Sequence, residues 1–150
     1  MNIFKEGACP KVELMKDIEF VKLAGDWFLH ADTCPISRMI KPECNHSVLD
    51  IKEDGTFRSA KELSIMGHRM QIHDVTGTLA GDQAGVDIAG KLHIGMNLLD
   101  TDYEQYAVFY QCFENISKVS EDKTLKPVHV EMVAIASRDA NWKDEEFTKV

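Results

Sequence analysis

The chain has 150 residues, 44% of them hydrophobic and 28% charged, which is ordinary for a globular protein and favours one domain over residues 1–150. The formal net charge of -8 argues against nucleic acid as a partner, because phosphates require clusters of Lys and Arg. No apolar run approaches the roughly 18–20 residues of a spanning helix, so we expect no membrane span.

From residue 22 onward, apolar and polar residues alternate with a period of two over short runs that turn residues separate. This pattern is typical of half-buried β-strands, and the Asp-Gly pair at residues 54–55 predicts a hairpin. We expect a helix to begin at Asp139 or Asn141, which would cap it. Before it we expect eight strands, at residues 23–32, 45–53, 56–65, 67–80, 86–94, 95–103, 106–113 and 127–138.

Eight antiparallel strands in up-and-down order can close into a barrel that holds one small ligand and leaves no free sheet edge. The predicted fold is therefore all-β, an eight-stranded antiparallel up-and-down barrel with a short C-terminal helix. Successive side chains of a strand point to opposite sides of the sheet, so each strand has one mostly apolar face. In residues 56–65 that face carries Phe57, Ser59, Lys61, Leu63 and Ile65.

Four cysteines, Cys9, Cys34, Cys44 and Cys112, are compatible with two disulfides in any of three pairings. Two Asn-x-Ser triplets, at Asn45 and Asn115, would permit glycosylation in a secretory protein. The first residues lack the apolar core of a signal peptide. The sequence so far leaves an intracellular protein, or one from which a signal has been removed.

Three separated motifs complete the pattern. Gly25-Asp26-Trp27 opens the first strand, the segment TDYEQYAVFYQC spans residues 101–112, and Ser137-Arg138 ends the last strand. In this order and at this spacing they resemble the lipocalin family. The Cys9-Pro10 pair ahead of the first strand is similar to the group of insecticyanin, bilin-binding protein, crustacyanin and apolipoprotein D.

The resemblance implies structural roles at a closed base of the barrel. Gly25 would turn the chain into the barrel, Trp27 would fill the base, and Arg138 would lie across its ring in a cation–π contact. Thr101, Asp102 and Tyr103 look like base-closing turn residues, with Asp102 accepting backbone N–H bonds. The group pattern also implies a Cys9–Cys112 disulfide.

The chain departs from the family pattern near its end, which falls early in the helix that normally follows Ser137-Arg138. The group pairs the position of Cys44 with a tail cysteine, but this chain has Cys34 instead. We therefore expect a Cys34–Cys44 bond that stiffens the loop over the mouth; otherwise Cys34 is free and Cys44 has lost its partner. A shortened helix would expose an apolar patch and favour homo-oligomers.

We take the inward positions of the strands as candidate ligand contacts. Lys61 would meet a carboxylate, or a bulge turns it out to solvent. Tyr106 and Tyr110 would donate hydrogen bonds to a carbonyl or propionate, or pack in the base layer. The full set of candidates is Leu29, Phe57, Lys61, Met70, Ile72, Val86, Leu98, Tyr106, Val108, Tyr110, Val130 and Met132.

The resemblance implies a secreted carrier of a small hydrophobic ligand, with a chromophore, biliverdin or a carotenoid, as the leading hypothesis. The alternatives are sequestration of a biogenic amine, eicosanoid, fatty acid or pheromone, and a protein that acts through its outer surface. Haem is not expected, although a branch of the family binds it through one inward His, for which His73 and His129 are the candidates. No catalytic motif stands out, so we expect no enzyme and no metal site.

Overall fold

The computed structural model describes residues 4–33, 39, 43–80, 83–88, 92–114 and 128–142. The chain there is almost entirely β-structure, which confirms the predicted class. Among the described residues, no helix is long and apolar enough to cross a membrane. The elements in chain order are β1 (Lys5–Glu6), the 3₁₀ helix η1 (Phe20–Leu23), β2 (Gly25–Asp32), β3 (Cys44–Ile51), β4 (Thr56–Ile65), β5 (His68–Ala80), β6 (Gln83–Ile88), β7 (Leu92–Thr101), β8 (Tyr106–Glu114) and β9 (Val128–Ser137).

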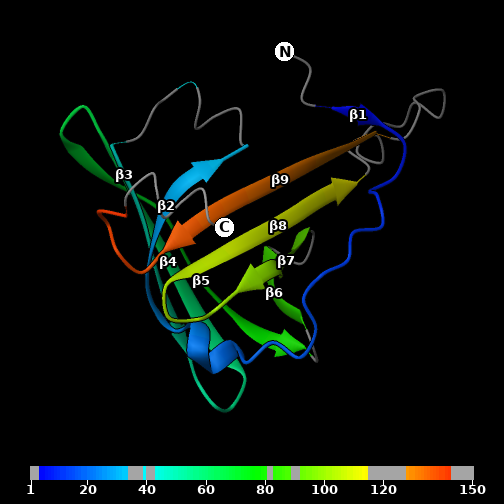
Figure 1. The fold of residues 1–150 in the computed structure, drawn as a ribbon, viewed down its shortest axis with the longest axis horizontal. Coiled ribbons are helices and arrows are strands. Elements are labelled where there is room, and N and C mark those ends of the chain that lie inside the picture. Colours follow the sequence, from blue (N-terminus) through cyan, green and yellow to red (C-terminus); the bar gives the residue numbers. More distant parts are fainter. Residues whose placement is uncertain are drawn as a thin grey trace.

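The strands follow the up-and-down order that the alternation predicted (Figure 1). Each strand from β2 to β8 pairs antiparallel with the next strand along the chain. The last strand, β9, also pairs antiparallel with β2. The eight long strands thus form a continuous ring of pairings. The two-residue strand β1, which the sequence did not predict, pairs with the start of β9, beyond the part that β2 occupies.

Local turn chemistry explains the two hairpins at β3–β4–β5. The Asp54 carboxylate accepts hydrogen bonds from the backbone N–H and the hydroxyl of Thr56, at 2.9 and 2.6 Å, and Gly55 has a φ of 86°. This is the predicted Asp-Gly hairpin. Between β4 and β5, Met66 and Gly67 both have positive φ, 50° and 77°, as tight hairpin turns require.

The prediction of two strands at residues 86–94 and 95–103 is wrong at their boundary. β6 already begins at Gln83, and β7 runs from Leu92 through Gly95 to Thr101. The glycines between these two runs suggest short turns or bulges, but Gly95 pairs with Gly85 of β6 inside the ladder. Glycine permits a turn without requiring one, and it also marks places where strands pair closely. The helix predicted from Asp139 lies mostly outside the described residues, and residues 140–141 form a turn.

The packed core lies at the end of the ring next to η1, which contributes Phe20 and Leu23 to it, and Figure 1 shows η1 at that end. Burial of these side chains supplies the main stabilisation of the fold, since each large apolar side chain contributes about 1.5–3 kcal/mol. The buried members of this cluster are Phe20, Leu23, Trp27, Leu49, Ile51, Phe57, Leu98, Ala107 and Ala136. The core therefore closes one end of the ring and sets the direction in which a site can lie.

Candidate functional site

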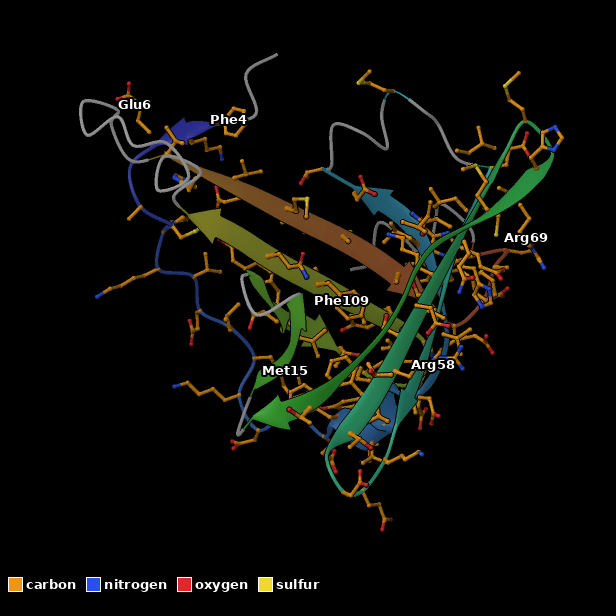
Figure 2. The ribbon with its side chains drawn as sticks, turned by 180° about the vertical axis from the view of Figure 1, so that it is seen from behind. Phe4, Glu6, Met15, Arg58, Arg69 and Phe109 are labelled. Carbon is orange, nitrogen blue, oxygen red and sulfur yellow. A yellow bond between two sulfur atoms is a disulfide. The ribbon has the colours of Figure 1, made fainter. Side chains whose placement is uncertain are left out.

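Trp27 fills the closed end. Its side chain is 2% exposed, and its indole N–H donates a 2.8 Å hydrogen bond to the carbonyl of Leu23 in η1. The ring of Phe109 meets it edge-on, with centroids 6.3 Å apart, and Figure 2 labels this residue on β8. The guanidinium carbon of Arg138 lies 3.9 Å from the centroid of the indole. This is the arrangement that the sequence motifs imply.

Arg138 also joins two segments of the chain. Its Nη1 donates to the carbonyls of Ala24 and Asp26, and its Nη2 donates to that of Lys22. Its Nε donates to the carbonyl of Tyr103. Burial lowers the pKa of Arg138, but an arginine keeps its charge in proteins. A side chain at Gly25 would come within 3.0 Å of Nη1, and φ is +106° there, so glycine is required.

The turn between β7 and β8 is held by its own side chains. One carboxylate oxygen of Asp102 accepts backbone N–H bonds from Glu104, Gln105 and Tyr106, at 3.2, 2.8 and 3.0 Å. Thr101 donates its hydroxyl to the carbonyl of Tyr106 and accepts the N–H of Tyr103. These contacts make the turn rigid, as predicted for Asp102. The motif residues are therefore parts of the scaffold below the site.

Strand register decides which side chains point into the ring. Trp27 pairs with Ser47, which pairs with Lys61, so these three share the inner face. On the other side of the ring, Ala136 pairs with both Leu29 and Ala107 and is 2% exposed. Because side chains alternate, Val130 and Met132 of β9 lie on the same inner face. Lys61 is thus on the predicted side.

The register of β8 differs from our expectation by one residue. Ala107 and Phe109 pack against the core, so Tyr106, Val108 and Tyr110 lie on the outer face instead. A hydrogen bond to Asp100 and burial raise the pKa of Tyr106 to about 12. Burial raises the pKa of Tyr110 to about 12 as well, with help from its bond to a carboxylate on β9. Neither tyrosine is placed to bind a ligand inside the ring.

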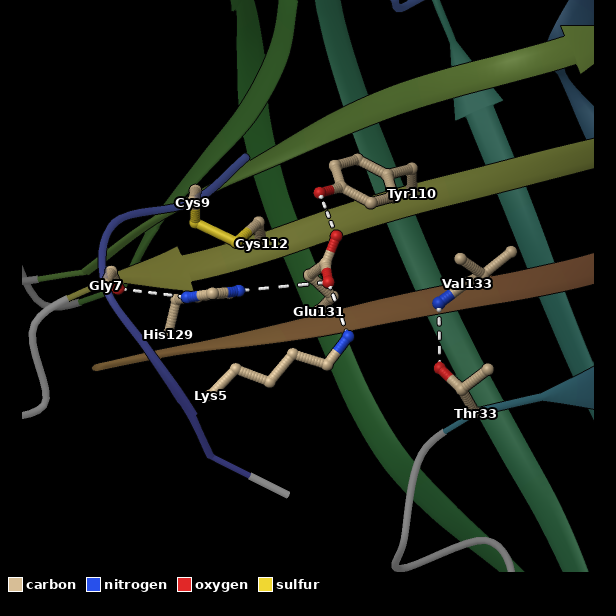
Figure 3. A network of polar contacts seen from close by, with 9 residues as sticks. All are labelled: Lys5, Gly7, Cys9, Thr33, Tyr110, Cys112, His129, Glu131 and Val133. Carbon is tan, nitrogen blue, oxygen red and sulfur yellow. Dashed lines mark hydrogen bonds and ion pairs between the residues drawn. A yellow bond between two sulfur atoms is a disulfide. The ribbon is translucent and has the colours of Figure 1, made fainter. Parts of the chain in front are cut away.

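The outer face of β8 and β9 holds the N-terminal segment (Figure 3). Glu131 accepts a hydrogen bond from the ammonium of Lys5 at 2.8 Å and one from the hydroxyl of Tyr110 at 3.0 Å. Both contacts lower the pKa of Glu131, Lys5 more strongly. The ring N–H at Nδ1 of His129 donates to the carbonyl of Gly7 at 2.9 Å. His129 is therefore occupied on the outer face and does not fit the role of an inward haem ligand.

The cysteines match the expectation in part. Cys9 and Cys112 form the predicted disulfide, which ties the N-terminal segment to β8. Cys44 is a free, exposed cysteine, and Cys34 lies outside the described residues. Because Cys44 is free, the expected Cys34–Cys44 bond is not formed in this structure, and that prediction is wrong here. In the described part of the chain, no group of three or more His, Cys, Asp or Glu side chains could hold a metal ion.

The candidate ligand contacts fall into groups. Phe57 and Leu98 belong to the packed core, at 3% and 0% exposure. Met70 and Ile72 are about half exposed, and Ile72 lies at a β-bulge in β5. The side chain of Val86 lies outside the described part of the chain, as does that of His73. The candidates that face inward and remain partly or largely exposed above the core are Leu29, Lys61, Met70, Val130 and Met132; Met70 pairs with the inward Leu63.

Asn45 is an inner-face residue that sequence analysis missed. It pairs with Leu63 on β4, and both side chains are buried, at 7% and 8% exposure. Its carboxamide Oδ1 has no hydrogen-bond partner. The Asn-x-Ser triplet at Asn45 would permit glycosylation in a secretory protein, but a side chain this deeply buried does not present its amide to a glycan-attaching enzyme in the folded protein. The sequence did contain a signal for this inward position, because side chains alternate along a strand and Asn45 therefore shares a face with Leu49 and Ile51.

Comparisons with known proteins agree on the fold. Insecticyanin from the tobacco hornworm Manduca sexta superimposes with a TM-score of 0.68 at 18% identity, over 99% of this chain and 78% of that one. Lobster apocrustacyanin A1 superimposes with a TM-score of 0.67 at 18% identity, over 99% of this chain and 81% of that one. The siderocalin Ex-FABP superimposes with a TM-score of 0.56 at 15% identity, over 85% of this chain and 81% of that one. No family model and no curated protein sequence matches. The chain has the lipocalin fold that its motifs predicted.

Proposed function

We propose that this protein is an extracellular carrier that binds a small apolar or amphipathic molecule inside the ring of strands. Above the core, the described inner face carries both apolar and polar side chains, and a small-molecule site usually combines apolar surface with a few polar groups. The apolar members are Leu29, Leu63, Met70, Val130 and Met132, and the polar ones are Asn45, Ser47, Ser59 and Lys61. The Cys9–Cys112 disulfide supports an extracellular location, because such bonds persist in oxidising compartments. The proposal includes no catalytic step.

The observation that carries the proposal is a contrast in burial between the packed end of the inner face and part of the wall beyond it, where Asn45 and Leu63 are buried but their neighbours on the same face are partly exposed. Near η1, the inward side chains of Trp27, Leu98 and Ala136 are at most 2% exposed. Further along the same face, Lys61 and Met132 remain partly exposed although they point inward. Inward side chains reach solvent only where the interior is not filled. The open end can therefore admit a ligand, while the packed end forms its floor.

We further propose a chromophore, a bilin or a carotenoid, as the ligand. The Cys-Pro segment and motif order resemble the pigment-binding group, and the fold is shared with insecticyanin and apocrustacyanin. A second candidate is a fatty acid or eicosanoid, because the ammonium group of Lys61 on the inner wall suits a carboxylate. Biliverdin also carries carboxylates, so Lys61 fits either ligand and only direct binding distinguishes them.

Titration with biliverdin and with a solubilised carotenoid, followed by visible absorption, tests the proposal. We expect a shifted, saturable absorption band. A matched pair of variants on β4 locates the site: Ser59 shares the inner face with Lys61, whereas Ala60 next to it points outward. Ser59→Trp should fill the interior and lower pigment affinity at least tenfold, and Ala60→Trp should leave it unchanged.

Two results would contradict the proposal. If Ser59→Trp and Ala60→Trp changed pigment affinity equally, with both variants folded by circular dichroism, the pigment would not bind in the interior. No response to either pigment, together with saturable binding of arachidonate or palmitate by calorimetry, would favour the second candidate. No response to any of these molecules would contradict a carrier role.

A further inference from the structure

Asn45 is held with its side chain pointing into the ring. The next residue, His46, is fixed on the outer face, where its ring stacks on Phe28 at 4.6 Å and its Nε2 lies 2.8 Å from a carboxylate oxygen of Asp26. Because adjacent strand residues point to opposite faces, the side chain of Asn45 points inward. Its backbone is fixed by the register with Leu63.

The start of β3 is also attached to the neighbouring hairpin. The backbone N–H of Glu43 donates to the carbonyl of Ser64 at 2.8 Å, and the Glu43 carboxylate accepts the N–H of Gly67 at 3.2 Å. The strand therefore has little freedom to turn Asn45 toward solvent. Asn45 as a whole is 7% exposed, and its buried Oδ1, held in place without a partner, is costly to a folded protein.

We propose that Asn45 determines the specificity of the interior site, and that its Oδ1 accepts a hydrogen bond from an N–H or O–H group of the ligand. This inference rests on the proposed carrier function and narrows it. The ligand class is an apolar molecule with at least one hydrogen-bond donor, such as the lactam N–H of a bilin or the hydroxyl of a hydroxylated carotenoid. A hydrocarbon of the same shape without a donor leaves Oδ1 unpaired.

The position of Asn45 agrees with such a role. It lies on the same wall as Ser47 and Lys61, on the strands that leave the packed core toward the open end. A site built to bond a hydroxyl discriminates strongly against an analogue that lacks it, because the buried acceptor is then left unpaired. Apolar contacts alone cannot produce this discrimination.

A pair of probes with one hydrocarbon skeleton tests the inference: retinol, which has a hydroxyl donor, and retinyl methyl ether, which has none. Binding is followed by probe fluorescence. For the wild type we expect retinol to bind about tenfold more tightly than the ether, the effect of one buried hydrogen bond. Asn45→Val, an apolar replacement that favours strands, should remove the preference. Ser47→Ala, two residues away on the same face, should retain it.

A second readout needs no ligand. If Oδ1 is unpaired in the free protein, Asn45→Val should raise or preserve the thermal midpoint of the ligand-free protein. A lower midpoint, or failure of both Asn45→Val and Asn45→Ala to fold, would show that the amide already has a partner, such as a buried water, and would overturn the inference.

The binding results separate this inference from the carrier function. Equal affinity of the wild type for both retinoids, or a preference that persists in Asn45→Val, overturns the role of Asn45 while a carrier role stands. Failure of both retinoids to bind also overturns it. The pigment titration of wild type, Ser59→Trp and Ala60→Trp then decides separately whether the carrier function fails as well.

Discussion

Replacing Arg138 tests the base of the molecule most directly. Arg138→Ala removes four hydrogen bonds, from the guanidinium to the carbonyls of Lys22, Ala24, Asp26 and Tyr103, together with the contact on Trp27. A hydrogen bond with a charged partner contributes about 1.5–3 kcal/mol, and a cation–π contact about 0.5–2 kcal/mol. Water can replace some of the four bonds, since Arg138 is only partly buried. Counting one full charged bond and the ring contact, we expect a loss of about 3 kcal/mol.

Urea unfolding followed by far-UV circular dichroism measures this loss as a change in the free energy of unfolding. Arg138→Lys is the matched control, because it keeps the charge without the planar fork of donors. We expect it to recover less than half of the loss, since one ammonium cannot reach both segments. A loss below about 1 kcal/mol for Arg138→Ala, or wild-type stability for Arg138→Lys, would refute this account.

Replacing Cys9 and Cys112 by Ser should lower the free energy of unfolding by about 4–5 kcal/mol, since the bond closes a loop with a sequence separation of 103. The control Cys44→Ser, at an exposed free thiol, should change urea stability by less than about 0.5 kcal/mol; equal effects would contradict the role of the disulfide. The attachment of β1 should weaken in acid, because Lys5 lowers the folded-state pKa of Glu131 below its ordinary value of 4.5. The Lys5–Glu131 ion pair contributes fully to stability above pH 4.5, and this contribution is lost as the pH falls through the lowered pKa of Glu131. The difference in stability between wild type and Lys5→Met should therefore be full near about pH 6 and shrink as the pH falls below the ordinary pKa of Glu131, whereas a difference independent of pH would exclude the ion pair as its cause.

Much of the fold could be predicted from local chemistry. β4 is observed at the predicted residues 56–65, and the turn at Asp54–Gly55 forms as its sequence indicates. Asp102 accepts the backbone N–H groups that its turn position implied. These features depend on neighbours in the sequence, so the sequence carries their signal. The boundary at Gly95 was missed because glycine is compatible with both a turn and a paired strand.

The candidate site was predicted less well, and β8 shows why. Its residues Ala107, Val108, Phe109 and Tyr110 place apolar side chains on both faces, so alternation reveals two faces without telling which is inside. Only the pairing of Ala107 with Ala136 on the inner face decides it. Asn45 was missed for a similar reason, since a polar residue in a local motif is readily taken as a surface residue.

The sequence by itself determined most of the strands and their order, because period-two alternation and turn residues act over short range, whereas the Trp27–Arg138 base was implied by the resemblance of its motifs to the lipocalin family. Tertiary structure alone decided which face of each strand lines the ring and which polar atom there has no partner. Register between strands is set by bulges and by neighbours distant in the chain, and a shift by one residue exchanges the two faces. Asn45 therefore became a candidate ligand contact only when its inward position and the unpaired Oδ1 were both visible.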